Sequence, residues 1–392
     1  MSSKAEVVII GGGVIGCSIA YHLAKQGVSS QIIERDAIAS QASGRAWAVI
    51  SAPATAMMLF EGTEEDIAAG NALVSKGSMR PCLSLFEEGL QRFPQLAQEL
   101  KEEGGVDIGF GELPMIRAVF DEGEEKYLKE RVSEPEREGF EVSWLDGDEV
   151  KARFPDIAPG VLGGVLLPGQ QVEPYRYVLA LAQAAEARGA SIKQGEAVGF
   201  GYQGSRVTSA ILARGEVEAE AVVLAMGPWA GQGTSWLGKE ISMRVMRVQS
   251  LRVEVSQRLP PYRLSGGQRG RVSIVPRVDG TVVLGHWLDD EVDFDDRPTE
   301  EAKNEMLDAA VALIPKLEEA KLIEHVAGLQ GLPPTGGLPM LGRFPRWDNV
   351  YLAAPGIFGI QWSPAIGRIM ADLIVTGRTE KFVESFSPAR FV

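Results

Sequence analysis

The sequence has few of the residues that crosslink small proteins or bind metal ions. Its 392 residues include only two cysteines, Cys17 and Cys82, and three histidines. Two cysteines are too few for a disulfide framework, and no histidine has a second His or Cys at metal-ligand spacing. We therefore expect neither a disulfide-stapled fold nor a metal-centred mechanism.

Long hydrophobic runs are also lacking. The most apolar N-terminal stretch, Val7 to Ala20, is interrupted by four glycines and has no basic segment in front of it. A membrane helix requires about 20 apolar residues, and a signal peptide requires a basic segment and a cleavage site. We expect neither, and we expect a cytoplasmic protein, with peripheral attachment to a membrane left open.

Positive charge is scarce relative to negative charge. The 39 Lys and Arg residues face 53 Asp and Glu residues, which gives a net charge of −14. Such a surface repels phosphate backbones, so we expect no nucleic-acid partner. Glycine is abundant, at 45 residues, but it follows no repeat, and 45% of the residues are hydrophobic. This composition is typical of a globular protein and excludes collagen-like and disordered chains.

The N-terminal segment has the pattern of a βαβ unit. Residues 7–10 form a β-branched apolar run, and residues 18–26 show helical spacing that ends at Gly27. Residues 31–33 form a second apolar run, which ends on Glu34. Buried apolar strands on both sides of a helix are typical of a parallel sheet. The pattern therefore predicts an α/β fold that binds a dinucleotide.

Three glycines and one acid give this unit its chemistry. In Gly11-x-Gly13-x-x-Gly16, the first glycine permits the tight turn and the second lets the backbone approach a pyrophosphate. The third lets the helix pack closely on the strand, and the helix N-terminus favours phosphate. Glu34 can accept hydrogen bonds from ribose hydroxyls and would repel a 2′-phosphate. NADP is therefore disfavoured, whereas FAD and NAD both remain.

Later segments carry a resemblance to one family. The small, polar stretch Ser40–Val49 resembles the segment that runs along the cofactor in the D-amino acid oxidase superfamily of FAD enzymes, which includes glycine oxidase-like, sarcosine oxidase-like and D-amino acid dehydrogenase-like proteins. Residues 220–230 resemble that family's strand and turn over the cofactor. Val350–Gly367 resembles its strand, glycine loop and helix at the flavin, and Pro364 is expected to open that helix. The resemblance continues in order along nearly all of the chain.

The resemblance implies a fold and a cofactor. The expected class is α/β (α+β), with a Rossmann-type FAD-binding domain and an interleaved antiparallel-sheet substrate domain. Non-covalent FAD is expected, because neither cysteine lies where a flavin tether would be placed. The FAD-binding domain is expected to comprise residues 1–80, 155–235 and 335–392, and the substrate-binding domain residues 81–154 and 236–334.

The motif and the resemblance together place a set of residues at FAD. This set comprises Gly11, Gly13, Val14, Ile15, Gly16, Glu34, Arg35, Ala42, Ser43, Gly44, Arg45, Trp47, Ala48, Val49, Val198, Ala225, Gly227, Gly356, Ile357, Phe358, Gly359, Ile360 and Gln361. The expected substrate contacts are Trp47, Gln330, Phe358 and Trp362, and the aromatic members favour a bulky or apolar amine. His286 and Gln330 are the catalytic candidates, His286 as a general base.

One position departs from the family pattern. The family's arginine that grips a substrate carboxylate is replaced here by Gln330, and a neutral amide cannot replace a guanidinium fork. Either the substrate is not a small amino acid, or another arginine binds its carboxylate. The candidates for that second role are Arg45, Arg117, Arg244, Arg247, Arg252 and Arg277.

The implied activity is FAD-dependent oxidation of an amine or amino-acid C–N bond to an imine, with hydride transfer to flavin N5. One alternative is a flavin dehydrogenase of a 2-hydroxy acid. Another is the FAD-carrying subunit of a hetero-oligomeric amino-acid or opine dehydrogenase. The expected partners are an amine or amino-acid substrate and an electron acceptor, which is oxygen, a quinone or a partner protein. The oligomeric state is left open.

Overall fold

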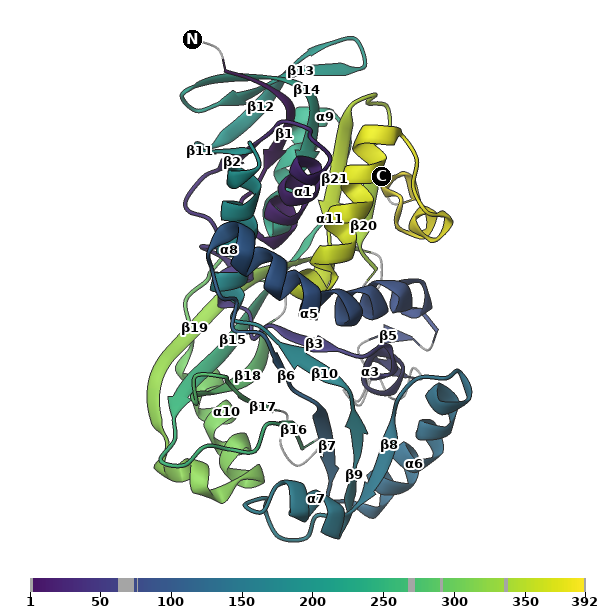
Figure 1. Cartoon of the computed structure of the whole chain (residues 1–392), viewed down its shortest axis with the longest axis vertical. Coiled ribbons are helices and arrows are strands. Elements are labelled where there is room, and N and C mark those ends of the chain that lie inside the picture. Colours follow the sequence, from purple (N-terminus) through teal and green to yellow (C-terminus); the bar gives the residue numbers. More distant parts are fainter. Residues whose placement is uncertain are drawn as a thin grey trace.

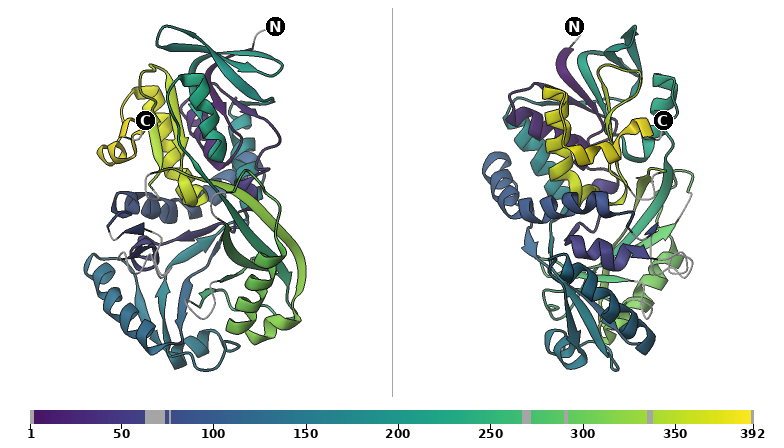
Figure 2. Two further views of the ribbon diagram at one scale, coloured as in Figure 1. Left: turned by 180° about the vertical axis from the view of Figure 1, so that it is seen from behind. Right: turned by 90° about the vertical axis from the view of Figure 1, so that its right-hand side faces the viewer.

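The computed structural model has two main sheets stacked along its long axis, one above the other in Figure 1 and again in the side view of Figure 2. Both chain ends belong to the upper part of the molecule in Figure 1. The residues that the structure describes are 3–62, 74–75, 77–266, 272–289, 292–334 and 338–390.

The upper sheet is built on a parallel centre. Its strands are β1 (Ser3–Ile10), β2 (Ser30–Glu34), β11 (Ser191–Gln194), β12 (Ala197–Gln203), β13 (Arg206–Leu212), β14 (Gly215–Leu224), β20 (Met340–Arg343) and β21 (Val350–Ala354). The order is β11-β2-β1-β14-β13-β12, with β21 beside β14 and β20 beside β21. β1 runs parallel to both β2 and β14, which confirms the βαβ unit.

Helices cover the upper sheet and extend its core downward. These are α1 (Val14–Lys25), α5 (Leu83–Gly104), α8 (Pro174–Ala187), α9 (Gly233–Leu237) and α11 (Gly359–Thr376). α1, α5, α8 and α11 share one buried cluster, in which Ile19, Phe93, Leu181 and Trp362 are almost wholly inaccessible to solvent. Among the described residues, no helix has the length and apolar character needed to cross a bilayer.

The lower sheet is mainly antiparallel. Its strands are β7 (Met115–Val119), β8 (Ser143–Asp146), β9 (Gly163–Leu167), β15 (Arg244–Glu254), β16 (Arg263–Ser265), β17 (Ser273–Pro276), β18 (Val282–Asp289) and β19 (Lys321–Leu332). They follow the order β19-β15-β18-β17-β16-β7-β9-β8. α6 (Glu122–Arg137), α7 (Gly147–Arg153) and α10 (Glu300–Leu313) pack on this sheet.

Short elements connect the two sheets. β3 (Val49–Ser51), β10 (Gly169–Gln171) and β6 (Gly111–Glu112) form a three-stranded sheet in the middle of the molecule. The remaining short elements are α2 (Ala42–Arg45), α3 (Pro53–Thr55), η1 (Ala56–Phe60), β4 (Glu61–Gly62), β5 (Val74–Ser75), η2 (Arg80–Cys82), η3 (Gly227–Gln232), η5 (Pro315–Glu319), η6 (Gly356–Phe358), η7 (Lys381–Phe386) and η8 (Pro388–Arg390).

The expected fold class is confirmed, but two elements differ from the expected domain boundaries. α5 falls in a segment expected to bind substrate, yet its apolar face, including Phe86 and Leu100, packs into the upper helical core. β9 falls in a segment expected to bind FAD, yet it pairs with β7 and β8 in the lower sheet. The chain therefore crosses between the sheets more often than the expected domain boundaries imply.

The start of α11 also differs from expectation. The helix begins at Gly359, so Pro364 lies inside it rather than opening it. A proline has no N–H to donate to the carbonyl four residues earlier, here that of Ile360. The Ser363 hydroxyl donates to that carbonyl at 2.7 Å instead. This local replacement lets the helix start one turn earlier, at the glycine loop.

Candidate functional site

The turn after β1 requires glycine at two positions. Gly11 has a φ of +113°, and a Cβ on it would collide with the carbonyl oxygen of Ala225. A Cβ on Gly16 would collide in turn with the carbonyl oxygen of Gly11. The first and third glycines of the motif therefore bring β1, α1 and the end of β14 into close contact.

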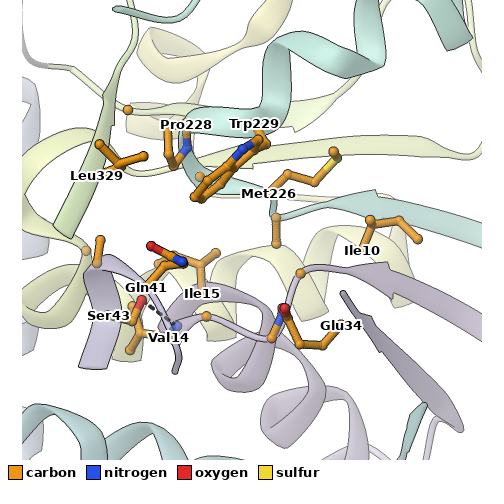
Figure 3. A pocket seen from close by; sticks show the side chains of 18 of the residues that line it. Ile10, Val14, Ile15, Glu34, Gln41, Ser43, Met226, Pro228, Trp229 and Leu329 are labelled. Carbon is orange, nitrogen blue, oxygen red and sulfur yellow. Dashed lines mark hydrogen bonds between the residues drawn. The ribbon is translucent and has the colours of Figure 1, made fainter. Parts of the chain in front are cut away.

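The second glycine lies at the N-terminus of α1. Gly13 is the residue before the helix, and a Cβ on it would lie 3.1 Å from the Ser43 hydroxyl oxygen. That hydroxyl accepts a hydrogen bond from the Val14 N–H at 3.0 Å (Figure 3). α2, which contains Ser43, is thereby fixed against the first turn of α1. Backbone N–H groups and the positive end of the helix dipole meet here, which suits a pyrophosphate.

Glu34 is held by the backbone beside this turn. Its carboxylate accepts from the Gly12 N–H at 2.7 Å and from the Asp36 N–H at 2.8 Å. The acid at the end of β2 is therefore fixed on the wall of the cavity shown in Figure 3. A carboxylate in this place can accept from ribose hydroxyls and repels a 2′-phosphate.

A long cavity runs from this turn toward the lower sheet. Figure 3 shows Ile15, Gln41 and Ser43 on one side of it, with Trp229 and Leu329 on the other. Segments 195–197, 225–229, 329–331 and 353–357 complete its walls. Most of these walls are strand ends, small residues and turn backbone, a composition that suits an extended dinucleotide.

A second pocket adjoins the far end of this cavity. Five residues line both: Ala42, Ala46, Gln330, Ile357 and Ile360. The second pocket continues away from the glycine turn and is lined further by side chains from both sheets. These side chains include Trp47, Ser51, Arg263, Phe358 and Gln361. Gln330 therefore lies at the junction, where its amide donates to the Gly356 carbonyl at 3.4 Å.

Most of the expected cofactor residues line one of these two spaces. The long cavity is lined by Gly11, Gly13, Val14, Ile15, Glu34, Arg35, Ala42, Ser43, Ala225, Gly227, Gly356, Ile357, Gly359 and Ile360. The second pocket is lined by Ala42, Arg45, Trp47, Ala48, Val49, Ile357, Phe358, Ile360 and Gln361.

Three of the expected cofactor residues lie outside both spaces. Gly16 packs against Gly11, as described above, and Gly44 packs against the Ala39 carbonyl. Val198 is 46% exposed and lines neither space. The three residues that precede it, 195–197, line the long cavity. The contact of Val198 with FAD therefore stays a prediction.

The expected substrate residues are divided. Trp47, Gln330 and Phe358 line the second pocket. Trp362 is wholly buried in the helical core, where its ring meets Phe86 edge-on and lies tilted against Phe358. It lines neither space, so we do not retain it as a substrate contact. His286 belongs to β18, but its side chain lies outside the described part of the chain. Its proposed role as a base therefore stays a prediction.

Most of the candidate arginines already have carboxylate partners. Only Arg45 among them lines the second pocket, and it pairs with Asp296 at 2.9 Å. Arg244 is exposed on β15. The others pair as Arg117 with Glu124, Arg247 with Asp289, Arg252 with Glu173 and Arg277 with Glu173.

A different arginine, which belongs to no sequence motif, lies in the second pocket. Arg263, at the start of β16, is 6% exposed, and its guanidinium carbon lies 4.6 Å from the centre of the Trp47 ring. Its hydrogen-bond partners are the hydroxyls of Ser273, at 3.2 and 3.3 Å, and Ser51, at 3.4 Å. Burial lowers the pKa of Arg263 to about 10, so it is still a cation at neutral pH.

The glycine turn, the helix N-terminus and the fixed acid form a dinucleotide-binding site, and a second pocket adjoins it. Comparison with known proteins specifies the cofactor. Residues 6–373 match the family of FAD dependent oxidoreductases, and the chain belongs to this family. The protein is therefore an FAD-dependent oxidoreductase, and the residues of the long cavity fit FAD.

The chain is similar throughout its length to several members of that family. It is 30% identical to glycine oxidase of Geobacillus kaustophilus and 28% identical to glycine oxidase of Bacillus licheniformis, in each case over 100% of this chain and 98% of the relative. The crystal structure of the Geobacillus kaustophilus glycine oxidase superposes with a TM-score of 0.85, covering 100% of this chain and 98% of that one. An L-proline dehydrogenase from P. horikoshii, at 22% identity and a TM-score of 0.83, shares the fold.

Proposed function

We propose that the protein oxidises the C–N bond of an amine or amino acid to an imine, and that water then hydrolyses the imine to a carbonyl compound and an amine. The observation that carries this proposal is the junction at Gln330 and Ile357, where the FAD cavity adjoins a separate, partly aromatic pocket. The similarity to two glycine oxidases supports the choice of an amine. When bound, FAD supplies the acceptor for the hydride that leaves the carbon next to nitrogen.

The chain's own residues orient the substrate and exclude water. Phe358 and Trp47 form apolar walls of the second pocket, and Gln361 fixes the third wall at β3. Its amide oxygen accepts from the Ser51 N–H at 3.0 Å, and its amide nitrogen donates to the Ser51 carbonyl at 2.5 Å. Rigid walls of this kind hold the reacting carbon near the junction, which is the main contribution a protein makes to hydride transfer.

The lining of the second pocket bears on proton transfer. The described residues that line it include neither a carboxylate nor a histidine. A protonated amine has no lone pair to form the C=N bond, so the amine has to reach the junction in its neutral form. We therefore propose that the rate of substrate oxidation rises with pH toward the pKa of the substrate amine.

Product analysis in air tests the proposed function. The purified, FAD-loaded protein is incubated with secondary amines and N-substituted amino acids, and carbonyl product, released amine and hydrogen peroxide are measured together. We expect the three products in equal amounts, because oxygen takes the electron pair that the substrate loses. Oxidation of 2-hydroxy acids with no amine oxidised would contradict the proposal. If carbonyl product forms without peroxide, and only when a quinone is added, the electron acceptor is a quinone rather than oxygen.

A further inference from the structure

Arg263 is buried without the partner that a buried cation normally has. The Nη1 and Nη2 groups each use one N–H on a serine hydroxyl, and each carries a second N–H with no acceptor among the described residues. No carboxylate of the described residues forms an ion pair with Arg263, and burial alone accounts for its lowered pKa. Buried charges are normally paired, because removing an ion from water without a counter-charge is costly.

The second deeply buried arginine of this region shows what a structural role looks like. Arg277 donates to the backbone carbonyls of Val172, at 3.2 Å, and Trp47, and to the Gln171 side chain at 3.3 Å. Glu173 lies 3.7 Å from its Nε. Arg277 therefore braces the segment that bears Trp47 with carbonyl acceptors and a nearby carboxylate. Among the described residues, the hydrogen-bond partners of Arg263 are the neutral hydroxyls of Ser51 and Ser273.

The surroundings of Arg263 fix its orientation and leave it facing the pocket. The Trp47 ring lies against the guanidinium, and Nη1 donates to the Ser51 hydroxyl. The backbone of Ser51 is in turn held by the Gln361 side chain. The Trp47 ring also lies against β18 at Gly285, where a Cβ would be in van der Waals contact with the ring. An arginine held by an aromatic face and two hydroxyls can bind a planar anion by donating hydrogen bonds from its remaining N–H groups.

We propose that Arg263 binds the substrate carboxylate, and hence that the substrate class is an amine that carries a carboxylate group. This inference rests on the proposed function and names its substrate class. Arg263 lines the second pocket but not the FAD cavity, whereas Gln330 lines both. The carboxylate is therefore bound at the end of the pocket away from FAD, and the C–N bond lies toward Gln330. An N-substituted or extended amino acid suits this separation better than glycine does.

A binding experiment without turnover tests the role of Arg263. FAD-loaded protein is titrated with phenylacetate and with phenylacetamide, its neutral analogue, and binding is followed by the change in the flavin absorption spectrum. We expect the parent protein to bind phenylacetate roughly a hundredfold more tightly than the amide, as for a charge-assisted pair. Arg263→Met should remove this preference, and Arg263→Lys should restore part of it. Arg258→Gln, which removes an exposed arginine, serves as the charge-matched control and should keep the preference.

The outcomes separate this inference from the proposed function. A parent protein that does not prefer the carboxylate, or an Arg263→Met variant that keeps the preference, overturns the inference. Matched substrates such as proline and pyrrolidine then test the class. Equal oxidation of both would contradict the inference and leave amine oxidation intact. Carboxylate binding that depends on Arg263, with no amine oxidised, would contradict the proposed function and leave the anion site intact. If Arg263→Met loses FAD, the FAD-loaded Arg263→Lys protein replaces it, and a preference for phenylacetate as large as that of the parent overturns the inference.

Discussion

The FAD cavity and the second pocket adjoin each other but are built in different ways. The FAD cavity is lined largely by turn backbone, glycines and strand ends, including Gly11, Gly13 and Gly356. The second pocket is closed by side chains such as Trp47, Arg263 and Phe358, which belong to segments far apart in the sequence. The FAD cavity thus presents mainly backbone to the cofactor, whereas we propose that the substrate is recognised by side chains that the tertiary fold brings together.

The largest expected effect of any substitution concerns the backbone side of this comparison. Gly13→Val places methyl groups where the backbone must approach the pyrophosphate, so we expect FAD affinity to fall on the order of a hundredfold or more. Equilibrium dialysis of the apoprotein against FAD measures this loss. Gly27→Ala is the control: it alters a left-handed glycine at the other end of α1 and should lower stability while FAD affinity is kept. Normal FAD loading of Gly13→Val would remove the fingerprint assignment.

A second test changes the junction between the two spaces. Gln330→Arg places a guanidinium next to the FAD cavity, so a small amino acid can bind its carboxylate close to the reacting carbon. We expect faster flavin reduction by glycine and slower reduction by the preferred amine, with a change in the ratio on the order of a hundredfold. Rapid reduction of the parent protein by glycine or D-alanine at low concentration would show that Gln330 does not set the substrate size.

The two buried arginines sharpen the comparison through protein stability. Arg277→Met leaves two backbone carbonyls and a side-chain amide without their donor, so we expect the free energy of unfolding to fall by about 2–4 kcal/mol. Arg263→Met removes a buried cation that has no counter-charge, so unfolding free energy should stay the same or rise by about 1 kcal/mol. Urea titrations of the ligand-free proteins measure both. A large loss of stability for Arg263→Met would indicate a structural role.

The smallest expected effect concerns the acid at the ribose end. Glu34→Gln keeps the shape of the side chain but removes its charge and one acceptor for ribose hydroxyls, so we expect roughly tenfold weaker FAD binding. The fold should remain intact, which circular dichroism of the same sample checks. Equal FAD affinity of the variant and the parent would show that Glu34 serves only to fix the turn at Gly12.

The sequence could predict the glycine turn and Glu34 because these parts of the FAD cavity lie close together in the chain. The run from β1 through the glycine turn and α1 to Glu34 has a strict local pattern, and β1, β2 and β14 pair as that pattern requires. The helix at the flavin loop was expected from its proline, yet Ser363 lets it begin at Gly359. Proline usually lies in the first turn of a helix, but here the Ser363 hydroxyl bonds to the Ile360 carbonyl that Pro364 leaves without a donor.

The second pocket could not be predicted in the same way. Arg263 lies in a three-residue strand with no motif around it, and its position follows from the pairing of β16 with β7 and β17. The arginines that seemed more suitable are paired with carboxylates, such as Arg247 with Asp289, that the sequence could not assign to them. Phe358 and Trp362 both pack against Phe86 in the helical core, but only Phe358 also lines the pocket. Such differences depend on long-range packing rather than on spacing.

Anaerobic flavin reduction tests the central claim most directly. The FAD-loaded protein is mixed without oxygen with equal concentrations of an N-substituted amino acid, the corresponding amine without its carboxylate, and the corresponding 2-hydroxy acid. The account predicts rapid bleaching of the flavin by the N-substituted amino acid, much slower bleaching by the amine, and none by the hydroxy acid. Bleaching by the hydroxy acid, with the amino acid inert, would contradict the account.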